Sequence, residues 1–86
     1  MRPHLDIYYD QGCPTCDHVL RIAQLVQEKM PDIIVTLIDL SESNSPRPDF
    51  IFAVPTYVLN DKTYSLGNPD EAILMDRLKA ELDEIL

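Results

Sequence analysis

The sequence contains no apolar run long enough to cross a membrane. A membrane-spanning helix needs roughly 20 consecutive, predominantly apolar residues, and no stretch of this 86-residue chain approaches that length. The N-terminal segment 1–6 also lacks the uninterrupted apolar stretch of a secretory signal. We therefore expect a cytoplasmic protein without a membrane partner.

Basic residues are scarce as well. Seven Lys and Arg residues stand against 15 Asp and Glu residues, which gives a formal net charge of −8. Nucleic acids and anionic membranes are polyanions that recruit clusters of basic residues, whereas the basic residues here are scattered along the chain. The charge therefore argues against nucleic acid as a partner. The excess of negative charge is explained either by a role in keeping the protein soluble or by a protein partner with a basic docking face.

The length and composition predict one domain that spans residues 1–86. A chain this short cannot support two separate cores. A hydrophobic fraction of 45% and a charged fraction of 26% are ordinary for a soluble globular protein, so the disordered and fibrous classes are excluded. We find no internal repeat or low-complexity segment, and we expect a monomer.

The predicted elements follow the order strand, helix, strand, loop, strand, strand, helix. The predicted strands are 5–9, 33–38, 56–59 and 63–66, and the predicted helices are 14–30 and one capped by Asn68. A strand–helix–strand unit implies a parallel pair with a right-handed crossover, and Asn60-Asp61-Lys62 is typical of an antiparallel hairpin turn. The apolar run 33–38 predicts a strand buried on both faces. The fold class is therefore α/β, with a mixed four-stranded sheet and packed helices.

Both cysteines lie in the motif Cys13-Pro14-Thr15-Cys16, after the first predicted strand and at the start of the first helix. A helix N-terminus has unpaired N–H groups and a partial positive charge, which stabilise a thiolate over a thiol. The thiolate is the species that attacks disulfides, so we predict Cys13 as the nucleophile and Cys16 as the resolving thiol. Pro14 suits the first helical turn, where its missing N–H has no intrahelical partner.

Two other uses of this cysteine pair remain open. A zinc site would need two further ligands, and His4 and His18 are the only histidines. His18 follows Cys16 closely on the same helix and His4 precedes the first strand, which is a poor geometry for four ligands. A purely structural pair is the other alternative, although structural disulfides are rare in cytoplasmic proteins. Redox chemistry is the interpretation we prefer.

A second motif, Val54-Pro55-Thr56, stands directly before the third predicted strand. Together with the Cys-x-x-Cys motif and the order of elements, it makes the chain resemble the thioredoxin-like superfamily from about Leu5 to Leu82. The resemblance implies a cis Pro55 that lies against the cysteines. It also implies that the Val54 backbone offers hydrogen bonds to the substrate. We predict Val54, Pro55, Pro14 and Thr15 as substrate-binding residues, and Gly67 matches the family's glycine before the last helix.

Several positions depart from the family pattern. The chain has no Trp before the cysteines, and Ile7 occupies the place of a buried Asp found in thioredoxins proper. The Pro14-Thr15 spacer is closer to the glutaredoxin motif Cys-Pro-Tyr-Cys. Glutaredoxins also grip glutathione with a lysine just ahead of that motif, and Asp10-Gln11-Gly12 supplies none. Their Gly-Gly-x-Asp segment is matched in part by residues 67–70.

The family helix between the second and third strands is shortened or replaced by a loop. Residues 41–48 are polar and contain two prolines, which favours a loop. We expect this to leave one sheet face thinly covered, with Phe50 and Phe52 as its lid, and we expect a single helical turn over 49–53.

Together these features predict a minimal thioredoxin-like thiol–disulfide oxidoreductase that acts on protein disulfides through Cys13 and Cys16. No bound cofactor is required, and an unidentified reductant restores the dithiol. Glutathione is disfavoured in that role. The alternatives are a glutaredoxin-like, glutathione-dependent reductase and a non-catalytic module that binds proteins.

Overall fold

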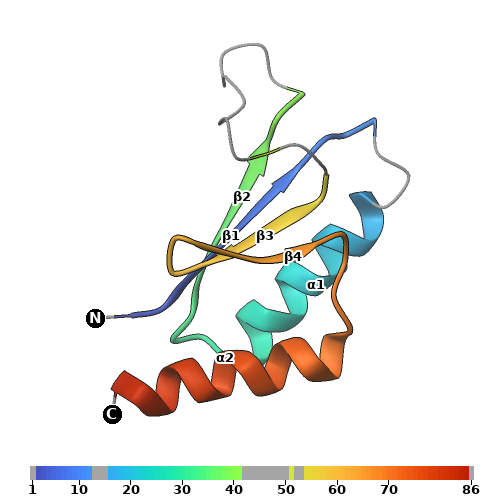
Figure 1. Ribbon diagram of the computed structural model, residues 1–86. Helices are drawn as coiled ribbons and strands as arrows, with labels where there is room; N and C mark the ends of the chain where they lie inside the picture. Colours follow the sequence, from blue (N-terminus) through green and yellow to red (C-terminus); the bar gives the residue numbers. More distant parts are fainter. Residues whose placement is uncertain (1, 13–15, 42–50, 52–53, 86) are drawn as a thin grey trace.

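The structure is a computed structural model that describes residues 2–12, 16–41, 51 and 54–85. In chain order its elements are β1 (His4–Tyr9), α1 (Cys16–Lys29), β2 (Ile34–Asp39), β3 (Thr56–Leu59), β4 (Lys62–Leu66) and α2 (Glu71–Ile85) (Figure 1). This is the predicted order, and each strand lies within one residue of its expected bounds.

The strands form one mixed sheet in the order β2-β1-β3-β4. β1 pairs in parallel with β2 and antiparallel with β3, and β3 pairs antiparallel with β4. The predicted α/β class and the mixed four-stranded sheet are therefore confirmed. β1 is a central strand, so both of its neighbours are positioned by its hydrogen bonds.

The hydrophobic core lies on the face of the sheet that both helices cover (Figure 1). Leu5 and Ile7 alternate along β1 and are fully buried, as expected for side chains on one face of a strand. Each such side chain contributes about 1.5–3 kcal/mol of hydrophobic stabilisation. The helical residues of the same cluster are Val19, Ile22, Ala23 and Val26 of α1 and Leu74 and Leu78 of α2.

The prediction that the strand near residues 33–38 is buried on both faces is wrong. β2 is an edge strand, because β1 is its single partner in the sheet that the described residues form. Ile34 keeps 46% of its surface exposed and Leu37 keeps 38%. A continuous apolar run is typical of central parallel strands, and the strand order, which depends on the rest of the chain, places this run at the edge instead.

The β3–β4 hairpin closes through a tight two-residue turn. Leu59 pairs with Lys62, and the intervening Asn60 and Asp61 have positive φ angles of 50° and 68°. Asn and Asp tolerate this left-handed conformation better than other non-glycine residues, which is why they are favoured in hairpin turns. The predicted hairpin is confirmed, with β4 beginning at Lys62.

The N-cap of α2 differs from the prediction. Asp70, not Asn68, caps the helix: its Oδ1 accepts a 3.1 Å hydrogen bond from the Ile73 N–H, and its carbonyl accepts one from Leu74 N–H. Either Asn or Asp can cap a helix, but the Asn68 side chain is already used elsewhere, since its Oδ1 accepts a 2.8 Å bond from the Tyr57 hydroxyl. Ile73, in the first turn of α2, is 64% exposed.

Most of the connection between β2 and β3 lies outside the described residues. The predicted loop beyond Ser41, the helical turn over 49–53 and the lid residues Phe50 and Phe52 all fall there. The structure describes Ile51 from this connection, and that side chain is buried. In the described ranges, no helix is both long enough and apolar enough to cross a membrane.

Candidate active site

The Val54-Pro55-Thr56 motif and the start of α1 lie at the same end of the sheet (Figure 1). Tyr8, near the end of β1, pairs with Thr56 at the start of β3, so Pro55 lies beside the carboxyl end of β1. The chain leaves β1 at that end and enters α1, which begins at Cys16 (Figure 1). Cys13, Pro14 and Thr15 lie outside the described residues. The first turn of α1 carries the exposed residues Asp17 and His18.

The turn ahead of the cysteine motif is held by side-chain hydrogen bonds. The Gly12 N–H donates to Asp10 Oδ1 at 2.8 Å, and the Gln11 side-chain amide donates to Asp39 Oδ2 at 2.7 Å. Asp39 ends β2, so this bond joins the turn to the neighbouring strand. The Gln11–Asp39 contact has no signal in the sequence, because these residues are far apart in the chain and neither belongs to a motif.

The Asp39 carboxylate accepts further hydrogen bonds, from Ser41. Its Oδ1 accepts a 2.6 Å bond from the Ser41 hydroxyl and a 2.9 Å bond from the Ser41 N–H. These bonds and the one from Gln11 stabilise the carboxylate, and the Ser41 hydroxyl contributes most to lowering the pKa of Asp39 below its ordinary value. The end of β2 and the turn before the cysteines are therefore joined through an ionised carboxylate.

The Val54–Pro55 peptide bond is cis, the isomer that the resemblance implies. Pro55 is buried, and its carbonyl accepts a 2.7 Å hydrogen bond from the Gly67 N–H. Gly67 has a φ of 91°, a conformation that side chains with a Cβ rarely adopt. The glycine after β4 thus fixes the backbone of Pro55, and Val54 is left half-buried at the rim of the sheet.

A shallow depression of about 430 Å³ lies between the start of α1 and the start of α2. Its charged groups are already paired: Arg21 forms an ion pair with Glu71, and His18 Nε2 lies 4.0 Å from the same carboxylate. Arg21 and Glu71 are 50 residues apart in the chain, so the sequence gave no signal of this pair.

On the sheet face that the helices cover, β1 has no ionisable side chain at the place of the family Asp. Ile7, which occupies that place, is fully buried. It pairs with Tyr57, which is also fully buried. Burial, followed by the negative charge of Glu71, raises the pKa of Tyr57 far above its ordinary value, so the phenol is a neutral hydrogen-bond donor. The Ile7 side chain has no ionisable group, so it cannot carry protons as the family Asp would.

Comparisons with known proteins agree on one fold. No family model matches the chain. A curated relative named thioredoxin, from Methanocaldococcus jannaschii, is 29% identical over 80 residues, which cover 91% of this chain and 94% of the relative.

Solved structures of thioredoxins are similar to this chain as well. Thioredoxin-2 of a malaria parasite, described as a component of the parasite's protein secretion machinery, superposes with a TM-score of 0.77. The identity is 16%, and the match covers 92% of this chain and 82% of the other. A mutant thioredoxin from Halobacterium salinarum gives a TM-score of 0.67 at 24% identity, over 91% and 73% of the two chains.

The mixed sheet, the two helices on one face and these structural likenesses define a thioredoxin-like fold. The relative from Methanocaldococcus jannaschii is similar to this chain over most of both sequences, and the solved thioredoxins share its fold.

Proposed function

We propose that this protein is a thiol–disulfide oxidoreductase that reduces or exchanges protein disulfides through Cys13 and Cys16. One observation carries the proposal: the chain enters α1 at Cys16 beside the same end of the sheet at which the cis Val54–Pro55 bond precedes β3. A helix N-terminus favours a thiolate there, and the half-buried Val54 backbone offers an edge for an extended substrate.

The reaction needs two exchange steps. The Cys13 thiolate attacks one sulfur of the target disulfide, so that a Cys13–target bond forms, the target disulfide breaks and one target thiolate leaves. The Cys16 thiolate then attacks the Cys13 sulfur, and the second target thiolate leaves. Two electrons pass to the target, the two departing thiolates take up protons from solvent, and a Cys13–Cys16 disulfide remains for an external dithiol to reduce.

Protein disulfides are the favoured substrate class over glutathione mixed disulfides. Glutathione carries two carboxylates and an ammonium group, which a specific site must pair. Among the described residues that line the depression beside α1, Arg21 forms an ion pair with Glu71. The Asp70 carboxylate accepts the hydrogen bond from the Ile73 N–H that caps α2. The basic group that would pair with a glutathione carboxylate and the carboxylate that would pair with its ammonium group are therefore already engaged within the protein.

Reduction of insulin disulfides in the presence of dithiothreitol tests the proposal. We expect the protein to accelerate insulin precipitation, and the Cys13→Ser variant to behave as the uncatalysed control. The Arg77→Gln variant is a matched control, because Arg77 lies on α2 and pairs with Glu81, away from the cysteine motif. If the parent protein shows no turnover, the chain is a non-catalytic binding module instead.

A further inference from the structure

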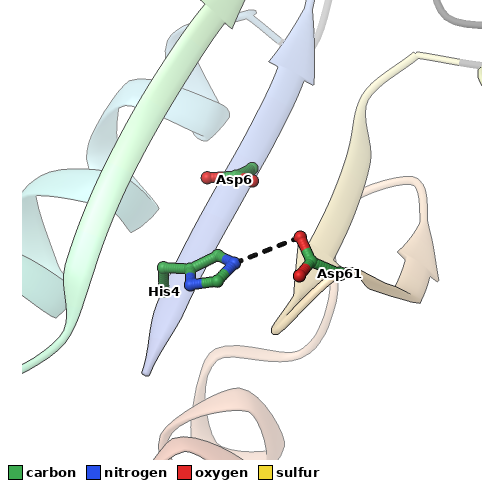
Figure 2. A group of neighbouring side chains, drawn as sticks. All are labelled: His4, Asp6 and Asp61. Carbon is green, nitrogen blue, oxygen red and sulfur yellow. Dashed lines mark hydrogen bonds and ion pairs between the residues drawn. The ribbon is translucent and has the colours of Figure 1, made fainter. Parts of the chain in front are cut away.

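His4, Asp6 and Asp61 form a compact group of metal-ligating side chains. His4 and Asp6 alternate with Leu5 and Ile7 along β1, so they lie on the sheet face opposite the helices. Asp61 comes from the β3–β4 turn beside them (Figure 2). One ligand atom from each residue lies within 4.8 Å of the other two, and His4 Nε2 is 3.3 Å from Asp61 Oδ1.

We propose that these three residues bind a divalent transition-metal ion, with Zn²⁺ as the representative ion. One imidazole nitrogen and two carboxylate oxygens are a donor set that Zn²⁺ accepts, with water in the fourth position. Tetrahedral ligands at about 2.0–2.2 Å from zinc stand about 3.3–3.6 Å apart. The His4–Asp61 separation of 3.3 Å already matches this spacing. The Asp6 carboxylate, with an oxygen within 4.8 Å of the other two ligand atoms, supplies the third ligand.

The backbone holds two of the three ligands in register. The His4 N–H donates to Asn60 Oδ1 at 3.0 Å, and the Asn60 N–H donates to the His4 carbonyl at 3.0 Å. The Asn60 side chain also donates to Glu81 Oε2 of α2 at 3.2 Å. Asp61 follows Asn60 directly, so its position relative to His4 is set before an ion arrives. A preorganised set of ligands loses less conformational entropy on binding.

The charge at this place also favours a cation. Across the described residues, no Lys or Arg side chain lies within ion-pair distance of Asp6 or Asp61, and His4 is the basic group beside them. Burial raises the pKa of Asp6; the charge of His4 lowers it, and that of Asp61 raises it again. Two neighbouring carboxylates with one imidazole carry a net negative charge that a divalent ion would neutralise.

The proposed metal site is separate from the proposed redox site. His4 begins β1, and the cysteine motif follows the other end of the same strand. Six residues of strand extend over roughly 17–20 Å. An ion bound by His4 would therefore act on the hairpin and the strands that the hairpin joins, at the end of β1 opposite the one from which the chain continues to α1.

Zinc titration of the full, untagged chain tests the site. The titration uses a Cys13→Ser/Cys16→Ser background, because thiolates themselves bind zinc. We expect one bound Zn²⁺ by calorimetry, and at least a tenfold loss of affinity in each of His4→Gln, Asp6→Asn and Asp61→Asn. Asp61→Asn keeps a residue that tolerates the positive φ of the turn, so circular dichroism should report an unchanged fold.

Two control variants and one spectroscopic readout separate this site from adventitious binding. His18→Gln and Asp32→Asn remove an exposed imidazole and an exposed carboxylate elsewhere, and we expect unchanged affinity for both. In imidazole NMR spectra, zinc should shift the His4 resonances and leave those of His18 in place. Absence of binding, equal affinity in all variants, or a shift at His18 alone would overturn the proposal. None of these outcomes bears on insulin reduction.

Discussion

The Gln11 side chain donates a 2.7 Å hydrogen bond to Asp39, and this bond joins the turn before the cysteine motif to the end of β2. Asp39 also accepts two bonds from Ser41. The same carboxylate therefore organises two segments that meet beside the candidate active site, and its ionisation state affects both.

The pKa of Asp39 predicts an acid-dependent loss of stability. Its hydrogen bonds lower the pKa in the folded protein below the ordinary value of 3.8, so its stabilising contribution is present above that value. The contribution is lost as the pH falls below 3.8 through the lowered pKa. We expect urea denaturation to show a smaller acid-induced loss in Asp39→Asn than in the parent between about pH 6 and about pH 3. An identical loss in both proteins would contradict this assignment.

The order of attack predicts asymmetric trapping by the two cysteine variants. In Cys16→Ser the first exchange step proceeds, but no resolving thiol follows, so a mixed disulfide with a model protein substrate should accumulate. Cys13→Ser should not form it, because the helix-end amides favour the thiolate at the first cysteine. Mass spectrometry after substrate incubation measures both. Equal trapping by the two variants would reverse or abolish the assignment of the nucleophile.

Glutathione should be a poor substrate. The Arg21 side chain forms an ion pair with Glu71, and the Asp70 carboxylate caps α2. Asp10 and Asp17 add negative charge close to the cysteine motif in the sequence. Loss of one charge-assisted bond costs about 1.5–3 kcal/mol, roughly ten- to a hundredfold in affinity. We expect slower turnover of a glutathione mixed disulfide than of a protein disulfide. Faster turnover of the glutathione substrate would make the glutaredoxin-like alternative the better description.

The Tyr57 hydroxyl should contribute measurably to stability. It is buried and donates a 2.8 Å bond to Asn68 Oδ1, which ties β3 to the segment before α2. Tyr57→Phe removes this bond and should lower the free energy of unfolding by about 0.5–1.5 kcal/mol in urea denaturation. Tyr64→Phe is the matched control, since Tyr64 is half-buried on the neighbouring strand β4 and its substitution leaves the Tyr57–Asn68 bond intact. An equal effect of both substitutions would show that the Tyr57–Asn68 bond contributes nothing specific.

Asp6 should destabilise the metal-free protein at neutral pH. Its folded-state pKa is raised, chiefly by burial, so the folded protein disfavours the ionised form. The stability of the parent therefore falls as the pH rises above 3.8 through the raised pKa. With a chelator at about pH 7, we expect Asp6→Asn to be more stable than the parent. The exposed control Asp32→Asn should be unchanged, and a less stable Asp6→Asn would show that the carboxylate has a favourable partner.

The elements of this fold could be predicted from the sequence because their signals are local. Helical spacing of apolar residues predicted α1, and Asn60-Asp61 predicted the hairpin, since few residue pairs tolerate two successive positive φ angles. The Cys-x-x-Cys and Val54-Pro55-Thr56 motifs indicated the superfamily. Each inference depended on residues that are neighbours in the chain, where propensity and periodicity act directly.

Only the tertiary structure decided which segments meet. The apolar run of β2 is compatible with a central or an edge strand, and the sheet order places it at the edge. Asn68 and Asp70 are both suitable helix caps. The Asn68 side chain accepts the hydrogen bond from the Tyr57 hydroxyl, and Asp70 caps α2. His4 and Asp61 are 57 residues apart. Their approach depends on strand register, a non-local property that results from packing the whole chain and that no short segment of sequence encodes.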